Sequence, residues 1–402
     1  MRKLCLILAG ILMLTACKAN PNENNTNNEP EVENPGRSMN LETSFNSLMD
    51  GLLVDGGENS CISPLSIKLA LAMAYNGADG ETKELLNTLF EKSPEELNEW
   101  AKAFLAAAAN YDGKNADEYS APNPELRVAN SFWIRKGDEK EISKDFTEAL
   151  TGNFNAESGE FNKNPDPINK WIAKATNDKI QNMLDDISPE AITYLVNALY
   201  FKAQWVQDFS ESATAPATFN NADGSTVDID MLNGWADGYI NTDKFEGITK
   251  NLFGGFTFTA LMPKTDEDVT LDEILDASND VDYDYSVINL RIPKFDLETS
   301  VEIGKGNHKE FDALFADNGM NKAIAQDAEN LTNLYISKVV HKTTFTLAEA
   351  GIEASAATVI MMETAAADIE PKEVSIVFDK PFYYTLTDSN GEVLFVGRIR
   401  QL

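Results

Sequence analysis

The side chains that could carry out nucleophilic or acid–base chemistry are few in this chain. Among 402 residues there are two histidines, His308 and His341, and three cysteines, Cys5, Cys17 and Cys61. A hydrolase triad would need a nucleophile beside one of the two histidines, and no nucleophile-elbow glycine pattern occurs. A structural zinc site is normally built from four Cys or His ligands, so we expect no metal and no other cofactor. The composition therefore argues against an enzyme.

The chain is strongly acidic. It carries 33 basic and 65 acidic side chains, which gives a formal net charge of −32. Nucleic acids and anionic lipid headgroups are bound by basic surfaces, so we expect neither as a direct partner. The apolar fraction of 43% is enough for a large core.

The N-terminus has the pattern of a secretion signal. Arg2 and Lys3 precede an apolar run over residues 4–14, and the segment 1–16 is too short to be a stable membrane span. The sequence LTAC at 14–17 resembles a bacterial lipoprotein processing site, which would make Cys17 the acylated first residue of the mature chain. The alternative is an ordinary cleaved signal with an incidental cysteine. We expect a cell-envelope protein, in the outer membrane or at the cell surface, that contacts a membrane only through this lipid anchor.

The rest of the chain divides into a tether and one domain. Residues 17–38 are rich in Asn, Pro and Glu and predict a flexible linker. No second linker or repeat follows, so residues 39–402 predict a single domain, which we expect to be monomeric. Helices are predicted over 41–53, after Ser63, from 94 to 109 and over 167–184, and strands over 193–201, 256–262, 287–295, 382–387 and 393–399. Helices early and strands late indicate an α+β fold.

One segment fits neither a helix nor a short turn. Residues 348–367 (AEAGIEASAATVIMMETAAA) connect two predicted strands, and a long connection of this kind is often functional. A surface helix is the simpler interpretation, but the apolar residues keep no helical stripe. Read with a period of two, the segment has one uncharged face, made of Ile352, Ala354, Ala356, Thr358, Ile360 and Met362. Inserted as a central strand, it would form about a dozen hydrogen bonds worth roughly 1 kcal/mol each.

These features, taken together, resemble the serpin family of protease inhibitors. The segment is similar to a serpin reactive-centre loop, with 349–358 as its hinge and 334–342 (LYISKVVHK) as the strand leading into it. Six further segments match family motifs in order: SCISPLS at 60–66, NSFW at 130–133, NALYFKAQW at 197–205, RIPK at 291–294, DKPF at 379–382 and LFVGR at 394–398. The resemblance implies helices around a large central mixed sheet, smaller sheets and an exposed reactive loop.

The resemblance also implies suicide inhibition of serine, and possibly cysteine, endopeptidases. The protease cleaves the loop and forms an acyl-enzyme, and the loop then inserts into the central sheet and carries the protease with it. The family's usual count from Glu349 places the scissile bond between Ala365 and Ala366, with an uncertainty of several positions. Residues Met361, Met362, Glu363 and Thr364 flank it. Small residues at this bond suit an elastase-like or other small-pocket serine protease, and the absence of Arg and Lys from 343–371 argues against trypsin-like targets.

Insertion requires small or apolar hinge residues. The hinge matches Glu349, Gly351, Ile352, Glu353, Ala354, Ser355, Ala356, Ala357 and Thr358. Ile352 stands where the family usually has threonine, and its bulk leaves open a second interpretation, a non-inhibitory serpin-fold binding protein. The residues that match the gate through which the loop enters the sheet are Ser63, Ser66, Asn197, His341, Trp205 and Lys294. A Lys294–Glu349 ion pair is expected to anchor the hinge.

Overall fold

The computed structural model describes eight stretches of the chain: residues 9–18, 44–54, 59–115, 122–265, 269–285, 287–306, 309–352 and 372–402. Three β-sheets and seven α-helices are formed within these stretches, which confirms the α+β class. The predicted scissile bond, its flanking residues and the hinge residues 353–358 lie outside them, as does His308.

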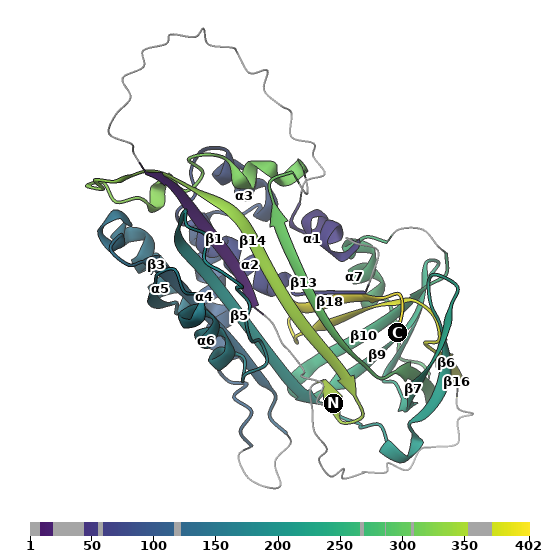
Figure 1. Ribbon diagram of the computed structural model, residues 1–402. Coiled ribbons are helices and arrows are strands. Elements are labelled where there is room, and N and C mark those ends of the chain that lie inside the picture. The colour runs from purple at the N-terminus through teal and green to yellow at the C-terminus, as the bar shows by residue number, and fades with distance from the viewer. Residues whose placement is uncertain are drawn as a thin grey trace.

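The largest sheet is built on two long strands, β5 (Ala191–Gln204) and β14 (Leu331–Ala348). On their outer sides β5 pairs with β3 (Glu125–Arg135), and β14 pairs with β13 (Phe295–Gly304). The strand β4 (Glu157–Phe161) extends the sheet beyond β3 in parallel orientation. Between β5 and β14 lie two segments, the short β15 (Gly351–Ile352) and β1 (Ala9–Lys18), both antiparallel to their neighbours. Figure 1 shows β1 between β14 and β5.

The other two sheets complete the β-structure. The second has the order β11-β8-β9-β10-β17-β18-β2, and the third has the order β16-β12-β7-β6. Their bounds are β2 (Ser60–Ile62), β6 (Ala215–Asn220), β7 (Thr226–Trp235), β8 (Gly238–Asn241), β9 (Phe245–Leu252), β10 (Phe256–Pro263), β11 (Val281–Asp282), β12 (Val287–Pro293), β16 (Glu373–Val377), β17 (Phe382–Thr387) and β18 (Val393–Ile399).

Two helices begin at the cap residues that the sequence predicted. Ser63 caps α2, and Ser93 and Glu96 form the predicted capping box of α4. The α-helices are α1 (Phe45–Val54), α2 (Pro64–Tyr75), α3 (Gly80–Phe90), α4 (Pro94–Ala108), α5 (Lys144–Phe154), α6 (Asp166–Ala175) and α7 (Leu271–Asn279). Short 3₁₀ turns lie at Glu139–Glu141, Glu211–Ala213, Phe253–Gly255, Lys309–Phe315 and Asn321–Ala323.

Two predicted elements are shorter than expected. The helix over 167–184 ends at Ala175, because Asn177 and Asp178 adopt left-handed backbone conformations that a helix cannot continue through. The strand over 287–295 is broken at Lys294, which separates β12 from β13. The predicted hairpin at Asn390-Gly391 is confirmed, with β17 and β18 at their expected bounds and Gly391 at a φ of 81°.

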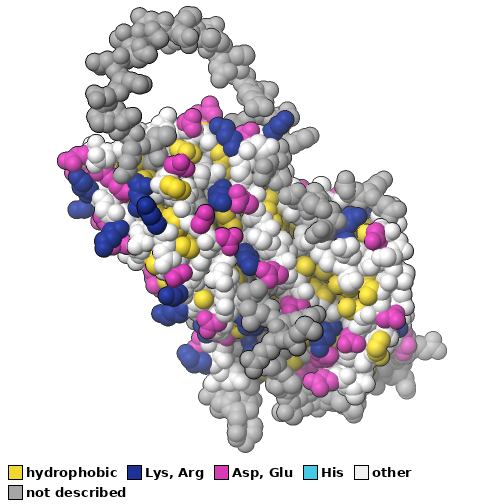
Figure 2. Space-filling view, in the orientation of Figure 1, with side chains coloured by type: hydrophobic (Ala, Val, Ile, Leu, Met, Phe, Trp, Pro, Cys, Tyr) yellow, Lys and Arg dark blue, Asp and Glu magenta, His cyan; other side chains and the backbone are white. Residues whose placement is uncertain are grey.

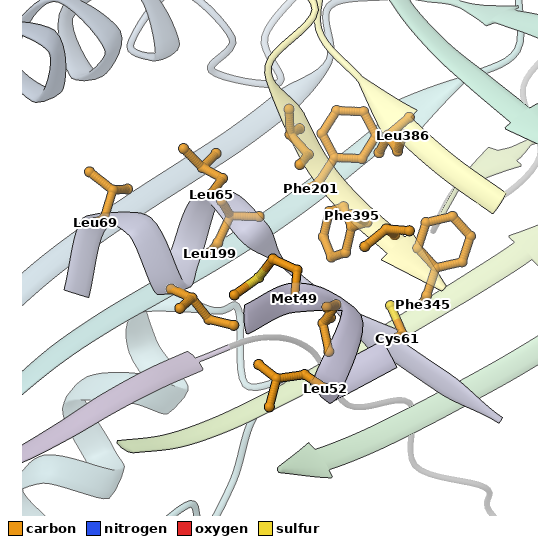
Figure 3. Packing of buried hydrophobic residues seen from close by; sticks show 14 of the residues in the cluster. Met49, Leu52, Cys61, Leu65, Leu69, Leu199, Phe201, Phe345, Leu386 and Phe395 are labelled. Atoms are coloured by element: carbon orange, nitrogen blue, oxygen red, sulfur yellow. The ribbon is translucent and has the colours of Figure 1, made fainter. Parts of the chain in front are cut away.

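The core lies between the sheets and around α1 and α2. The helix α2 is buried along nearly its whole length and packs against both β5 and β18. Figure 3 shows Met49 and Leu65 from these helices near Leu199, Phe345 and Phe395 from three different strands. Cys61 is a free, fully buried thiol whose pKa is raised to about 12 by its burial. This cysteine therefore packs as a small apolar side chain.

The predicted signal segment contributes a strand to the full-length chain. Residues Ala9–Lys18, which include Cys17, form β1. Residues 19–38 of the predicted tether lie outside the described part of the chain. Among the described residues, no helix has the length and apolarity needed to cross a membrane.

The acidic charge is not gathered into one patch on the visible face. Figure 2 shows Asp and Glu side chains intermingled with Lys and Arg over this face of the molecule. Ion pairs such as Lys338–Glu302 and Lys342–Glu298 join neighbouring strands. Such exposed pairs contribute little to stability individually, so the core determines the fold.

The close approach of Gly397 to a buried ring gives a test of this packing. Gly397 pairs with Tyr384 and Cys61, and a Cβ atom at this position would overlap the Tyr384 ring. We expect Gly397→Ala to lower the free energy of unfolding by about 1–3 kcal/mol, measured by urea denaturation, because the ring has no space to move. Gly304→Ala is the matched control, since a Cβ atom there meets nothing within 4 Å. Equal effects of the two substitutions would contradict the packing.

Candidate functional site: the hinge and the insertion lane

We call the space between β5 and β14 the insertion lane. The end of the lane next to the C-terminus of β14 is held by Glu349, the first residue after that strand. The Glu349 carboxylate accepts a hydrogen bond from Lys294 Nζ at 2.7 Å and another from Thr214 Oγ1 at 3.1 Å. The Lys294 side chain is 42% exposed and that of Glu349 is 14% exposed, so solvent partly screens the pair. The expected Lys294–Glu349 ion pair is thus present at the hinge.

These contacts determine the protonation of Glu349. Partial burial alone would raise the pKa of its carboxyl, but the hydrogen bonds from Lys294 and Thr214 outweigh that effect and lower the pKa below its usual value. Glu349 is therefore ionised at neutral pH and keeps its attraction to Lys294.

The backbone of the hinge is bound to the segment that follows β5. Trp205 donates from its indole Nε1 to the carbonyl of Ala348 at 3.0 Å and from its backbone N–H to the carbonyl of Ala350 at 3.1 Å. The backbone N–H of Phe209 donates to the carbonyl of Glu349 at 2.9 Å. Three successive hinge carbonyls are therefore fixed in place. The sequence motif located Trp205, but it gave no sign of Phe209.

The first loop residues already lie in the lane. Gly351 pairs with Ala348 and Gln204, and Ile352 pairs with Leu347 and Ala203, so β15 bridges both long strands. Gly351 has a φ of 152°, and a Cβ atom there would overlap the carbonyl oxygen of Ala203. Ile352 is only 3% exposed. The lane thus accommodates the branched side chain of Ile352. From the sequence, the bulk of this residue left open the interpretation as a non-inhibitory binding protein.

A buried lysine lies behind the hinge. Lys250 on β9 is 2% exposed, donates to the carbonyl of Trp235 at 2.7 Å, and lies 4.6 Å from the Phe209 ring centroid and 5.6 Å from that of Trp205. Burial lowers the pKa of Lys250 to about 8, although the negative charges of Asp237 and Asp208 oppose this shift. Nothing in the sequence pattern distinguished this lysine, because it lies in a strand among polar neighbours.

A polar cluster lies beneath the middle of the lane. Ser63, Ser66, Asn197 and His341 are all fully buried. The backbone N–H of Ser63 donates to His341 Nε2 at 3.0 Å, the N–H of Ser66 donates to Ser63 Oγ at 3.1 Å, and Asn197 Nδ2 donates to Asn130 Oδ1 at 2.8 Å. Burial lowers the pKa of His341 to about 3, so the ring is neutral. The structure links Ser63, Ser66 and His341 through hydrogen bonds, and it places Asn197 across the lane from His341, bonded to Asn130.

Three polar atoms of this cluster have no partner within the described part of the chain: Ser66 Oγ, Asn197 Oδ1 and His341 Nδ1. Buried polar atoms are normally hydrogen-bonded. The cluster therefore has unused capacity to form further hydrogen bonds. No group of three or more potential metal ligands occurs among the described residues.

The buried Lys250 predicts a pH dependence of stability. Between about pH 8 and pH 10.5 the folded chain has released the Lys250 proton while the unfolded chain still binds it. The free energy of unfolding should therefore rise with pH in this window, by at most roughly 1.4 kcal/mol per unit. Lys250→Met removes this contribution, so the difference in unfolding free energy between the two proteins should change across the window. Lys163→Met, at an exposed position, is the control. If the difference in unfolding free energy between the wild type and Lys250→Met stayed constant across the window, this would contradict loss of the Lys250 proton in the folded chain.

Comparison with known proteins identifies the family. The family model described as serpin (serine protease inhibitor) matches residues 43–402. Iripin-8 of Ixodes ricinus is 28% identical over 374 residues, covering 86% of this chain and 88% of that protein. Neuroserpin of Mus musculus is 27% identical over 372 residues, covering 85% of this chain and 86% of that protein. The native-state crystal structure of the thermophilic serpin Tengpin superposes with a TM-score of 0.72 at 24% identity, covering 96% of this chain and all of that one. With its three sheets, hinge and insertion lane, the chain belongs to the serpin family.

Proposed function

We propose that this chain is a suicide inhibitor of serine endopeptidases that traps its target by inserting the cleaved loop into the lane between β5 and β14. The family supports protease inhibition in general. The observation that carries the specific mechanism is β15, because Gly351 and Ile352 already bridge the two long strands at the start of the loop. Insertion requires this pairing to continue down the lane, into the positions where β1 lies in the full-length chain.

The chemistry is supplied by the protease. Its serine hydroxyl attacks the carbonyl carbon at the scissile bond, which we place at Ala365, and the amine of Ala366 leaves with a proton. The resulting ester would normally be hydrolysed by water. Insertion of the loop before that hydrolysis displaces and distorts the attached protease and stops deacylation. This mechanism uses no catalytic residue of the inhibitor, in keeping with its two histidines.

The loop sequence supports a small-pocket target. Ala365 and Ala366 are small, and residues 343–371 contain no Arg or Lys for a trypsin-like pocket. An elastase-like protease is therefore the proposed partner, with Met361, Met362 and Thr364 as alternative sites for chymotrypsin-like or subtilisin-like enzymes. A cysteine endopeptidase could form the equivalent thioester.

We further propose attachment to a cell-envelope membrane through acylated Cys17. The apolar run followed by LTAC at 14–17 supports this proposal. The test is metabolic labelling with a fatty acid, which should mark the wild-type chain and leave Cys17→Ala unlabelled. Labelling of both proteins would contradict the assignment to Cys17.

The inhibitory mechanism predicts a covalent complex. An elastase-type serine protease mixed with the mature chain, from residue 17 onward, should give a band near the summed masses that resists detergent and heat. Mass spectrometry of the released C-terminal peptide should place its N-terminus at Ala366. Cleavage in the loop without such a band would instead favour the non-inhibitory interpretation.

Gly351→Ala tests whether trapping of the protease requires the hinge to pair with both strands of the lane. Its Cβ atom would overlap the Ala203 carbonyl oxygen, so insertion should be slowed and more inhibitor should be cleaved without trapping the protease. Gly304→Ala, in an uncrowded part of β13, should trap the protease as well as the wild-type chain does. Unchanged trapping by Gly351→Ala would contradict the importance of β15.

A further inference from the structure

The insertion lane is occupied by the chain's own N-terminal segment. The strand β1 pairs with β14 from Ala9 opposite Lys342 to Lys18 opposite Leu331. On its other edge it pairs with β5 from Ala9 opposite Ala198 to Thr15 opposite Ala191. Figure 1 shows this strand along the middle of the largest sheet. Residues 331–342 of β14 and 191–198 of β5 thus face residues 9–18 across the lane.

The register of β1 coincides with the register that the reactive loop would have. Gly351 lies opposite Ala348 and Gln204, and Ile352 lies opposite Leu347 and Ala203. Counting on residue by residue, an inserted Ala357 would lie opposite Lys342 and Ala198. Those two residues are the present partners of Ala9. The register counted along β14 agrees with the register counted along β5. An inserted loop would therefore take the positions that β1 occupies, and the two segments exclude one another.

The two segments also carry similar residues at equivalent positions. The loop reads ATVIMM over 357–362, and the N-terminal segment reads AGILML over 9–14. Alanine opens both segments, a small residue follows, and the remaining four positions are aliphatic or methionine. Methionine occupies the fifth position of both. If β5 and β14 can pair with one of these two segments, they can therefore also pair with the other.

The buried polar cluster lies beside the middle of the lane. Gly10 lies opposite His341 on β14 and opposite Asn197 on β5. These are two of the gate residues through which the loop has to pass. The N-terminal segment thus occupies the gate as well as the pairing positions.

We propose that residues 9–18 act as an intramolecular plug that blocks loop insertion until the N-terminal segment is removed. In the unprocessed chain, a protease that cleaves the loop would deacylate by hydrolysis before the loop could enter the lane. Hydrolysis of the peptide bond between Ala16 and Cys17 consumes one water molecule and leaves a carboxylate on Ala16 and an amine on Cys17. That cleavage removes residues 9–16 of β1 and frees the lane. The proposal rests on the insertion mechanism above and adds its regulation by N-terminal processing.

The test uses the full chain, produced without export so that residues 1–16 remain attached. Leu12→Pro places in the middle of β1 a residue that lacks a backbone N–H and is disfavoured in a central strand. Leu6→Pro is the matched control, since residue 6 lies before β1. Each protein is incubated with the elastase-type protease, and the yield of detergent-resistant complex is measured. We expect Leu12→Pro to give several-fold more complex than the wild-type chain, and Leu6→Pro to resemble the wild type.

A second measurement separates the plug from the inhibitory mechanism. After loop cleavage, the melting temperature of Leu12→Pro should rise because its loop enters the free lane, whereas that of the wild-type chain should change little. A rise in Leu12→Pro alone supports the plug even if neither protein traps the protease, in which case only the proposed inhibition fails. Equal trapping, or an equal rise, in both proteins would overturn the plug and leave inhibition intact.

Hydrogen exchange tests the plug without any substitution. In the intact wild-type chain, backbone amides over residues 11–15 should be protected to an extent similar to those of β5 and β14, because these residues pair with both strands. Rapid exchange over this segment would overturn the proposal, even if Leu12→Pro failed to fold.

Discussion

The inner edges of β5 and β14, which face the insertion lane, are the constraint on which the rest of this molecule depends. Each strand is paired on its outer side, with β3 or β13, and each presents a row of N–H and C=O groups to the insertion lane. Most of these two strands is buried, and a buried backbone group without a partner costs free energy. The lane is therefore a strong binding site for an extended chain. The hinge occupies the end of the lane next to Ala348, and residues 9–18 occupy the part from Lys342 to Leu331 of β14.

The surroundings of the lane combine firm attachment with the capacity to rearrange. At the hinge end, Trp205 and Phe209 bind the three successive carbonyls of Ala348, Glu349 and Ala350, and Lys294 binds the Glu349 side chain. Beneath the middle, three buried polar atoms of Ser66, Asn197 and His341 have no partner among the described residues. A fully satisfied polar network would hold the strands in one arrangement. The unsatisfied atoms leave this network without that restraint.

Local sequence signals predicted much of the fold because their causes are local. Ser63, the Ser93–Glu96 box and the Asn390-Gly391 turn each act within a few residues, and all three lie where the sequence placed them. The helix beyond Ala175 was predicted wrongly, because left-handed conformations at Asn177 and Asp178 end it despite a continuing apolar pattern. The break at Lys294 was also missed, since each part of that segment alternates like a strand.

By itself, the sequence determined that the chain has only two histidines and three cysteines for catalytic or metal chemistry, and that residues 348–367 alternate like a strand within a loop. It also placed Glu349, Lys294, Trp205 and His341 in one family pattern. Only the tertiary structure decided that Lys250 lies buried behind the hinge, and that residues 9–18 share the register of the reactive loop. Burial and strand register depend on residues more than a hundred positions apart. A pattern read along the chain records which strands can pair, and the packed sheet determines which of them do.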